Sequence, residues 1–410
     1  MDGLVQDLLS YLRNPGSHGA NDNRLFARLV AEKPALRIGP LWVFSGHESV
    51  TKLAGDARCV MRLPDEWNAT RGIQPEVAAL TERLLPVQPP TDHKRLRRLL
   101  TGEFSARAMV RLRERVAQIV AELFDAAVAR GECDFIADVC VPLPVFTTAA
   151  MLGIPERDRD YVLTWARRLN GSIINEVTAL TGASVPASSA NGLVEIIGYI
   201  EELVRDRRRN PGPDLVSRLN VRADSADGSL EHDELVALVA MLFMTGIDTV
   251  GSELANVVQS LHDHPEVWDR VVAEPALARN AFAEGTRLHP ALPAASRITS
   301  ADIPLGGTVI PTGATVLLMY GAANLDPAVF PHPLRLDLDR SQASSLGFGH
   351  GVHYCLGASL AMMQGELVLR ALADRSPNFR IAGGQSRRRT ELAFHGLAEL
   401  RLVLTEPTLV

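Results

Sequence analysis

Cysteines are scarce in this chain of 410 residues, and they lie far apart. Cys59, Cys133, Cys140 and Cys355 form no CxxC pair and are too few for a disulfide framework in a chain of this length. This usage fits a reducing compartment, so we expect a cytoplasmic protein. A lone cysteine can still serve as a nucleophile or as a metal ligand.

Long hydrophobic runs and an excess of positive charge are also missing. The longest apolar run, residues 235–244, is about half the roughly 20 residues that a membrane-spanning helix needs. The first four residues do not resemble the start of a secretion signal. The 42 Lys and Arg residues are outnumbered by 48 Asp and Glu residues, which gives a net charge of -6. We therefore expect neither a membrane nor a nucleic acid as a partner.

No Gly/Ser-rich linker or low-complexity tract divides the chain, so we expect a single domain over residues 1–410. Apolar residues recur at three- and four-residue spacing through most of it, which predicts helices. Strand signals are few and short, so the expected fold class is mainly α (α+β) with small peripheral sheets. The predicted helices cover residues 74–84, 108–129, 157–169, 193–209, 231–262 and 276–288, and the predicted strands cover residues 41–45, 315–319 and 400–404.

One cysteine lies in a glycine-rich segment that precedes an apolar helix. Residues 348–357 read FGHGVHYCLG, and a helical pattern covers residues 358–369. Glycines allow tight turns and a close approach to a flat cofactor, while the start of a helix presents N–H groups and a positive dipole end to Cys355. We expect this arrangement to favour the thiolate. A buried, unreactive cysteine in a turn is the alternative that these residues leave open.

An unusual sequence interrupts the long helix predicted for residues 231–262. The segment TGIDT, residues 245–249, contains a glycine and three poor helix formers. Gly246 would let a ligand lie against the backbone, and Asp248 and Thr249 place a carboxylate and a hydroxyl side by side, where they would relay protons. We therefore expect Asp248 and Thr249 to be catalytic. An ordinary buried helix with a packing glycine and a back-bonded threonine is the alternative.

Two further pairs of polar residues occur at helical spacing. Glu284 and Arg287 are three residues apart, and His93 and Arg97 are four apart, so each pair shares one face of a helix. Taken alone, either pair is typical of a solvated helix surface.

The glycine-rich segment resembles the haem-binding signature FxxGxxxCxG of the cytochrome P-450 family, the haem-thiolate monooxygenases. Phe348, Gly351, Cys355 and Gly357 match it with the same spacing. The resemblance implies that Cys355 is the axial ligand of the iron of haem b and that the other three residues surround this ligand. It also implies a helical prism with small peripheral β-sheets, in which the haem lies between the long central helix and the helix after the cysteine.

Three other segments resemble motifs of this family, in the expected order. Residues 245–249 look like its (A/G)Gx(D/E)T motif, with Thr245 where Ala or Gly is usual. Glu284 and Arg287 resemble its ExxR pair, which is structural, and a third segment resembles its HxxxR helix. A haem buries two carboxylates, which need cationic or N–H donors. The resemblance implies four donors for these propionates: His93, Arg97, Arg297 and His353.

The resemblance implies a monooxygenase that uses O2 and electrons from an external ferredoxin and ferredoxin reductase. We expect a monomer that hydroxylates, epoxidises or cyclises a small, mostly apolar substrate, as in natural-product biosynthesis. The pocket walls expected from motif positions are chiefly apolar, which favours such a substrate. They include residues 67–87 and 173–174. The individual wall residues are Met241, Leu242, Thr245, Gly246, Ala294, Ala295 and Phe394.

Other functions stay open. A peroxide-driven haem-thiolate enzyme would not need Asp248 and Thr249, and a catalytically silent haem-binding or recruitment module would be expected to lose them or Cys355. All three residues are present, which favours the monooxygenase.

Basic residues offer a docking surface for an acidic electron-transfer protein, because such encounters are steered by charge. The candidates are Arg95, Arg98 and the cluster at residues 387–389. Ordinary solvated surface charge is the alternative for the cluster.

Overall fold

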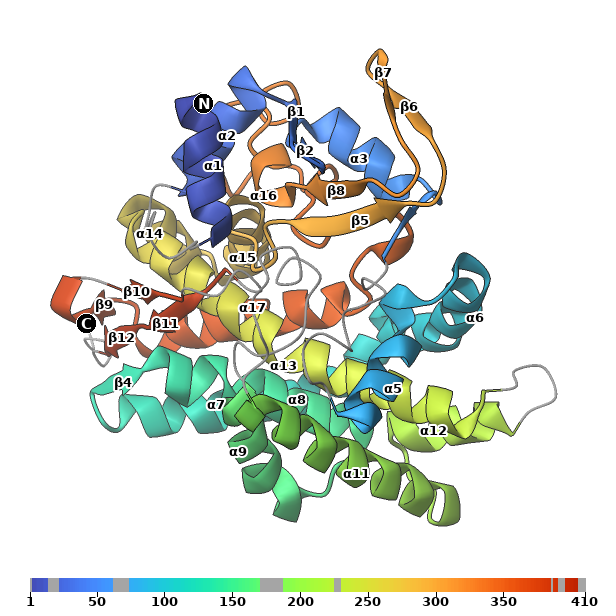
Figure 1. The fold of residues 1–410 in the computed structure, drawn as a ribbon. Helices are drawn as coiled ribbons and strands as arrows, with labels where there is room; N and C mark the ends of the chain where they lie inside the picture. The colour runs from blue at the N-terminus through green and yellow to red at the C-terminus, as the bar shows by residue number, and fades with distance from the viewer. Residues whose placement is uncertain are drawn as a thin grey trace.

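The computed structural model describes residues 2–13, 22–61, 74–169, 187–224, 230–384, 386–389 and 395–404. Helices dominate, and the strands gather in small sheets at the edges (Figure 1). The expected mainly α fold with peripheral sheets is confirmed. The helices are α1 (Gly3–Arg13), α2 (Asp22–Glu32), α3 (His47–Gly55), α5 (Pro75–Arg83), α6 (Pro90–Thr101), α7 (Ala106–Val128), α8 (Pro142–Leu152), α9 (Arg159–Leu169), α11 (Ala187–Arg209), α12 (Leu215–Ala223), α13 (His232–His262), α14 (Pro265–Ala273), α15 (Ala278–Leu288), α16 (Tyr320–Ala323) and α17 (Ala358–Arg375).

The largest sheet joins the first part of the chain to a segment far along it. Its order is β1-β2-β8-β5-β3, in which β2 and β8 are parallel and the other pairs are antiparallel. With α1, α2 and α3 it forms the upper part of the molecule in Figure 1. The strands are β1 (Ala35–Ile38), β2 (Leu41–Phe44), β3 (Cys59–Val60), β4 (Glu132–Asp134), β5 (Ala295–Thr299), β6 (Ile303–Leu305), β7 (Thr308–Ile310), β8 (Thr315–Leu318), β9 (Arg380–Ile381), β10 (Arg387–Arg388), β11 (Leu397–Glu399) and β12 (Arg401–Val403).

Helix α13 runs through the middle of the fold (Figure 1) and is buried along most of its length. A capping box begins it, in which Glu231 and Glu234 each accept a backbone N–H of the other residue. Its 31 residues are long and apolar enough to span a membrane, yet 83% of its most apolar window is buried inside the fold. This burial is that of a core helix.

Glu284 and Arg287 are fully buried on α15, so they are not the surface pair that their spacing alone suggests. The Arg287 guanidinium donates to both Glu284 carboxylate oxygens over 2.8 Å. Glu284 also accepts from Arg340 over 2.9 Å and from Gln342 over 2.8 Å. One carboxylate thus ties α15 to the segment that leads into the glycine-rich loop.

Asn324 continues this connection. Its carbonyl oxygen accepts from Arg287 over 2.8 Å, and its side-chain oxygen accepts from the backbone N–H of Leu346 over 2.7 Å. Gly347 then packs so closely on Thr286 that a Cβ there would lie 2.7 Å from the Thr286 methyl group. The ion-pair core therefore fixes where the glycine-rich loop begins.

Candidate active site

The loop before α17 holds Cys355 through its own backbone. The Cys355 N–H donates to the Phe348 carbonyl over 2.9 Å, and the half-buried Phe348 side chain packs against the main core. Gly349 and Gly351 have φ of 73° and 71°, a region that favours glycine. A Cβ at Gly351 would lie 2.5 Å from the Ala54 carbonyl oxygen, so close packing on α3 requires a glycine here.

Gly357 caps the start of α17, and its backbone N–H bonds to the Cys355 sulfur. Part of Cys355 is exposed, but protein atoms flank its thiol, and burial raises the thiol pKa. The Gly357 N–H and the Arg97 charge act in the opposite direction and do not offset it. In the protein alone, burial therefore opposes ionisation of this thiol. A metal cation at the sulfur would reverse this balance, since a coordinating thiol loses its proton.

The residues of the HxxxR segment lie beside this loop. Arg97 on α6 donates to the Tyr354 carbonyl, and the His93 ring lies edge-on to the His353 ring with centroids 4.8 Å apart. Burial lowers the pKa of His353 to about 3, and the charges of Arg297, His93 and Arg97 act in the same direction. The four residues predicted to bind the propionates are thus brought to one place.

Three of these donors, Arg97, His93 and His353, face no acidic side chain among the described residues. Within the described ranges, no Asp or Glu forms an ion pair with Arg97, His93 or His353. Burial lowers the pKa of Arg97, and only the charge interaction with Cys355 acts against this shift. A partly buried guanidinium beside two imidazoles is a suitable site for a carboxylate from a bound molecule.

On α13, the two threonines of the TGIDT segment make the same local bond. The Thr249 hydroxyl donates to the Thr245 carbonyl over 2.9 Å, and the Thr245 hydroxyl donates to the Met241 carbonyl over 2.8 Å. Thr245 is exposed and Thr249 is half-buried, although most of α13 is buried. The core helix therefore leaves this one stretch accessible, with hydroxyl oxygens that can still accept hydrogen bonds.

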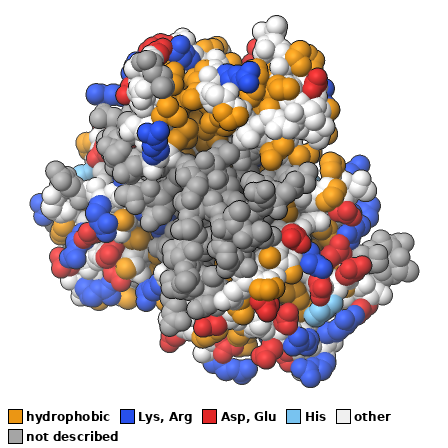
Figure 2. Space-filling view, in the orientation of Figure 1, with side chains coloured by type: hydrophobic (Ala, Val, Ile, Leu, Met, Phe, Trp, Pro, Cys, Tyr) orange, Lys and Arg blue, Asp and Glu red, His pale blue; other side chains and the backbone are white. Residues whose placement is uncertain are grey.

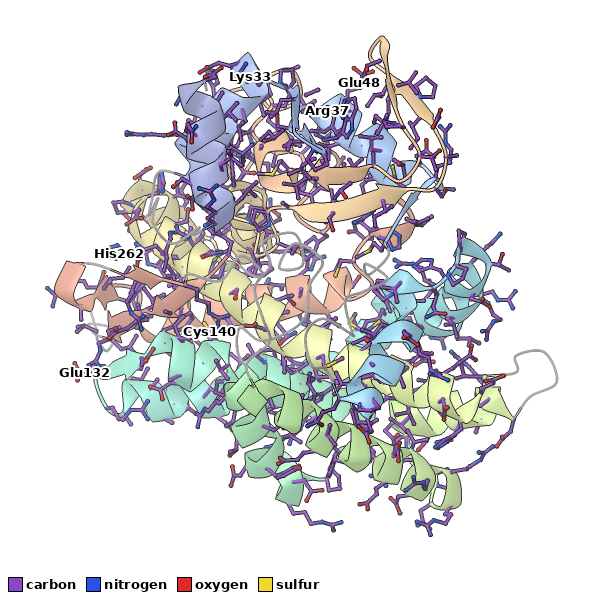
Figure 3. All side chains as sticks on the ribbon, in the orientation of Figure 1. Lys33, Arg37, Glu48, Glu132, Cys140 and His262 are labelled. Carbon is purple, nitrogen blue, oxygen red and sulfur yellow. The ribbon has the colours of Figure 1, made fainter. Side chains whose placement is uncertain are left out.

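The glycines of α13 allow close packing of helices. A Cβ at Gly246 would lie 2.7 Å from the Thr148 hydroxyl of α8, and one at Gly251 would lie 2.4 Å from the Cys140 carbonyl oxygen. Cys140, labelled in Figure 3, ends a short π-helix (Ile136–Cys140) against α13. Gly246 therefore makes a close packing contact with Thr148.

Asp248 has a partner far along the sequence. The Arg389 guanidinium donates to its carboxylate over 2.8 Å, and both side chains are buried. With Ser252 they line a small internal cavity between α13 and the π-helix. Arg389 is thus withdrawn from the surface, and burial lowers the pKa of Arg388. The prediction that residues 387–389 form a docking surface is wrong for Arg388 and Arg389, and only Arg387 is exposed.

Comparison with known proteins assigns the chain to a family. The cytochrome P-450 family model matches residues 189–375. The cyclomarin C epoxidase CymV of Salinispora arenicola is 34% identical over 347 residues, which cover 84% of this chain and 85% of that protein. This chain belongs to the cytochrome P-450 family. The mycinamicin IV hydroxylase/epoxidase of Micromonospora griseorubida is also 34% identical, over 89% of this chain and 90% of that protein. The crystal structure of CalO2 has a TM-score of 0.86 at 29% identity, over 96% of this chain and 98% of that chain.

As a cytochrome P-450 the protein is an oxidoreductase, a monooxygenase with haem b as its cofactor, held in this family by a cysteine thiolate. The structure fits this cofactor. Cys355 is accessible at the start of α17, and donors without an acidic partner in the described ranges stand beside it for the propionates.

Four of the residues predicted to form the substrate walls are buried in the core. Met241 and Leu242 are buried on α13, and Ala294 and Ala295 are buried around the start of β5. Phe394 lies outside the described residues, as do residues 173–174 and residues 67–73 of the segment 67–87.

Two features of this cytochrome P-450 were missed at the sequence level. Arg389, the partner of Asp248, is 141 positions away from it, and no local pattern connects the two. Glu253 is buried on α13, where it accepts the Ala291 N–H over 2.8 Å. Its signal was available, since an acidic residue in an apolar helix needs a reason to be there.

Proposed function

We propose that Cys355 is the axial ligand of the haem iron and that the enzyme inserts one oxygen atom of O2 into a small, mostly apolar natural product. One observation carries the proposal. The accessible Cys355 sulfur lies at the N-terminus of α17, beside the donors Arg97, His93 and His353, which have no acidic partner in the described part of the chain.

In this proposal each group has one task. Bound haem supplies the activation of dioxygen and the transfer of one oxygen atom. Cys355 donates electron density to the iron, and the Gly357 N–H orients the sulfur. Arg97, His93, His353 and Arg297 compensate the charge of the propionates. The Thr249 hydroxyl, accessible in the middle of α13, moves protons to the reacting oxygen, and Asp248 belongs to the same proton path.

The substrate class follows from the walls and from the relatives. Met241, Leu242, Ala294 and Ala295 offer only apolar surface. The similar proteins are named for hydroxylation and epoxidation of cyclomarin C and mycinamicin IV. Thr245 adds an accessible hydroxyl oxygen one turn before Thr249, which would accept a hydrogen bond from a polar atom of the substrate.

We also propose that the chain acts in the cytoplasm as one monomeric unit and receives electrons from a ferredoxin and its reductase. Arg98 and Lys94 are exposed on α6, next to the exposed Val352 and Tyr354 of the Cys355 loop. Arg95, in contrast, is ion-paired with Glu234 and Asp92, so it contributes little free charge. Around the face shown in Figure 2, basic and acidic side chains are intermixed.

The first test is the difference spectrum of the reduced, carbon-monoxide-bound protein. A strongly red-shifted Soret band after reduction with dithionite is expected for a thiolate ligand. The same band should form when a surrogate ferredoxin and reductase replace dithionite, and more slowly at high salt. Haem-replete protein without the band would refute the ligand assignment. Cyclomarin C and mycinamicin IV then serve as probes of the pocket through the ferric Soret shift.

Thr249→Ala is expected to separate electron use from product formation. Because the hydroxyl that moves protons is lost, product per electron pair should fall about 10-fold or more and hydrogen peroxide should rise. Product and peroxide measured in the same reaction check this. Thr249→Ser, which keeps the hydroxyl, should restore most of the coupling. Full coupling in the alanine variant would contradict the role of Thr249.

A further inference from the structure

Glu253 lies one helical turn after Thr249, so the two side chains share one face of α13. It is only 5% exposed and is surrounded along the helix by apolar residues such as Leu254 and Val257. It takes no part in the ion-pair core around Glu284 or in the group of propionate donors. A buried acidic residue at this position requires an explanation.

The hydrogen bonds of Glu253 are incomplete for a carboxylate. Its Oε2 accepts the Ala291 N–H over 2.8 Å, whereas Oε1 is buried and has no hydrogen-bond partner among the described residues. A buried charge without a cation costs far more than a buried neutral acid. Protonation removes that cost and turns Oε1 into a donor. In agreement, burial raises the pKa of Glu253 to about 8, and the Ala291 N–H and the Thr286 hydroxyl only partly oppose it.

The elements packed around Glu253 present it with few charges. Helix α15 contributes the Thr286 hydroxyl, and the turn after it contributes the Ala291 N–H. The loop before α17 contributes the Cys355 thiol, whose pKa Glu253 raises through space. No cationic side chain acts on Glu253 within the described part of the chain. Its surroundings therefore favour the proton-bearing form.

The two acids near Thr249 lie in opposite environments. Asp248 accepts a hydrogen bond from a buried guanidinium, so a cation faces it directly. Glu253 faces only a hydroxyl, an amide and a thiol. When two neighbouring acids are placed so differently, the one kept neutral is the proton donor.

We propose that Glu253 is the internal acid that returns a proton to Thr249. This inference rests on the proposed function, because it assumes that Thr249 gives up its hydroxyl proton during the reaction. The O–H bond of Glu253 then breaks and a new O–H bond forms on Thr249, across one helical turn of about 5.4 Å that the side chains and one bridging water span. Glu253 is left as a carboxylate and regains its proton from solvent. No electron moves in this exchange, and Glu253 acts only through Thr249.

Two substitutions separate this role from a purely structural one. Glu253→Gln keeps an oxygen that accepts the Ala291 N–H but has no acid proton. Glu253→Asp keeps an acid proton but is one methylene shorter, so it loses reach to Ala291. If Glu253 only anchors the turn after α15, the aspartate variant is the impaired one. If Glu253 supplies protons, the glutamine variant is the impaired one.

The deciding measurement is infrared spectroscopy of the haem-loaded protein, which needs neither substrate nor turnover. The wild type should show the carbonyl band of a buried carboxylic acid at pH 7, which disappears as pH rises through about 8. The band should be absent from Glu253→Gln and present in Glu253→Asp. The reduced, carbon-monoxide-bound spectrum of each variant shows separately whether the haem and its ligand are intact.

Oxygen consumption driven by a surrogate ferredoxin and reductase gives the functional result. Glu253→Gln should slow it roughly 10-fold, below the roughly 100-fold typical of a group that transfers the proton directly. It should also flatten the decline of the wild-type rate above pH 8, while Glu253→Asp retains that decline. A wild type without the acid band, or an aspartate variant slower than the glutamine variant, overturns the proposal. Absence of the red-shifted Soret band in the wild type would instead refute the proposed function itself.

Discussion

Replacing Cys355 by alanine is expected to abolish the red-shifted Soret band of the reduced, carbon-monoxide-bound protein and all monooxygenase activity. The sulfur stands at the start of α17, while the backbone groups beside it are already bonded: the Cys355 N–H donates to the Phe348 carbonyl and the Tyr354 carbonyl accepts from Arg97. Without the thiolate, the iron loses the electron density that oxygen activation needs. The spectrum and the product yield are measured on protein reconstituted with haem.

A matched control distinguishes loss of the ligand from loss of the fold. Cys59 is buried in β3, an edge strand of the five-stranded sheet. Cys59→Ala also removes one cysteine sulfur. This variant should keep both the band and the activity. Propionate donors remain in Cys355→Ala, so it should still bind haem, though more weakly. A red-shifted band retained without Cys355 would mean that another residue is the ligand.

Local patterns were sufficient where the chemistry is encoded in consecutive residues. The glycine-rich segment, the helix after Cys355 and the threonines of α13 lie where the spacing predicted. Helical periodicity also predicted the core helix, whose observed bounds are His232–His262. In each case the residues that determine the geometry are close neighbours in sequence.

Predictions from local pattern failed where a distant partner decides. Arg389 was expected to belong to a basic surface cluster, but it is buried in an ion pair with Asp248. The close packing of Gly246 on Thr148 of α8 is likewise a contact that no local pattern indicates. Burial around Cys355, which raises the pKa of its thiol, also comes from segments distant in sequence. Tertiary packing and desolvation determine these properties, and neither is visible in a single segment.

Glu284→Leu is expected to lower the free energy of unfolding by about 3–5 kcal/mol, because it leaves a fully buried Arg287 without its counter-charge. This is a large part of the roughly 5–15 kcal/mol that stabilises a typical domain. Glu284 also accepts hydrogen bonds from Arg340 and Gln342, so its loss should loosen the segment that leads into the Cys355 loop. Urea unfolding and the fraction of protein that retains haem measure both effects.

The exposed pair of Arg28 and Glu32 on α2 supplies the control, since its side chains are 48% and 50% exposed. Glu32→Leu should cost less than about 1 kcal/mol and leave haem binding unchanged. The comparison isolates the effect of burial, because each substitution removes a carboxylate that is paired with an arginine on its own helix. If the two variants were equally stable, the network around Glu284 would not be what holds the glycine-rich loop in place. A selective loss of haem from Glu284→Leu would show that the ion-pair core acts on the site through the segment between Asn324 and Leu346.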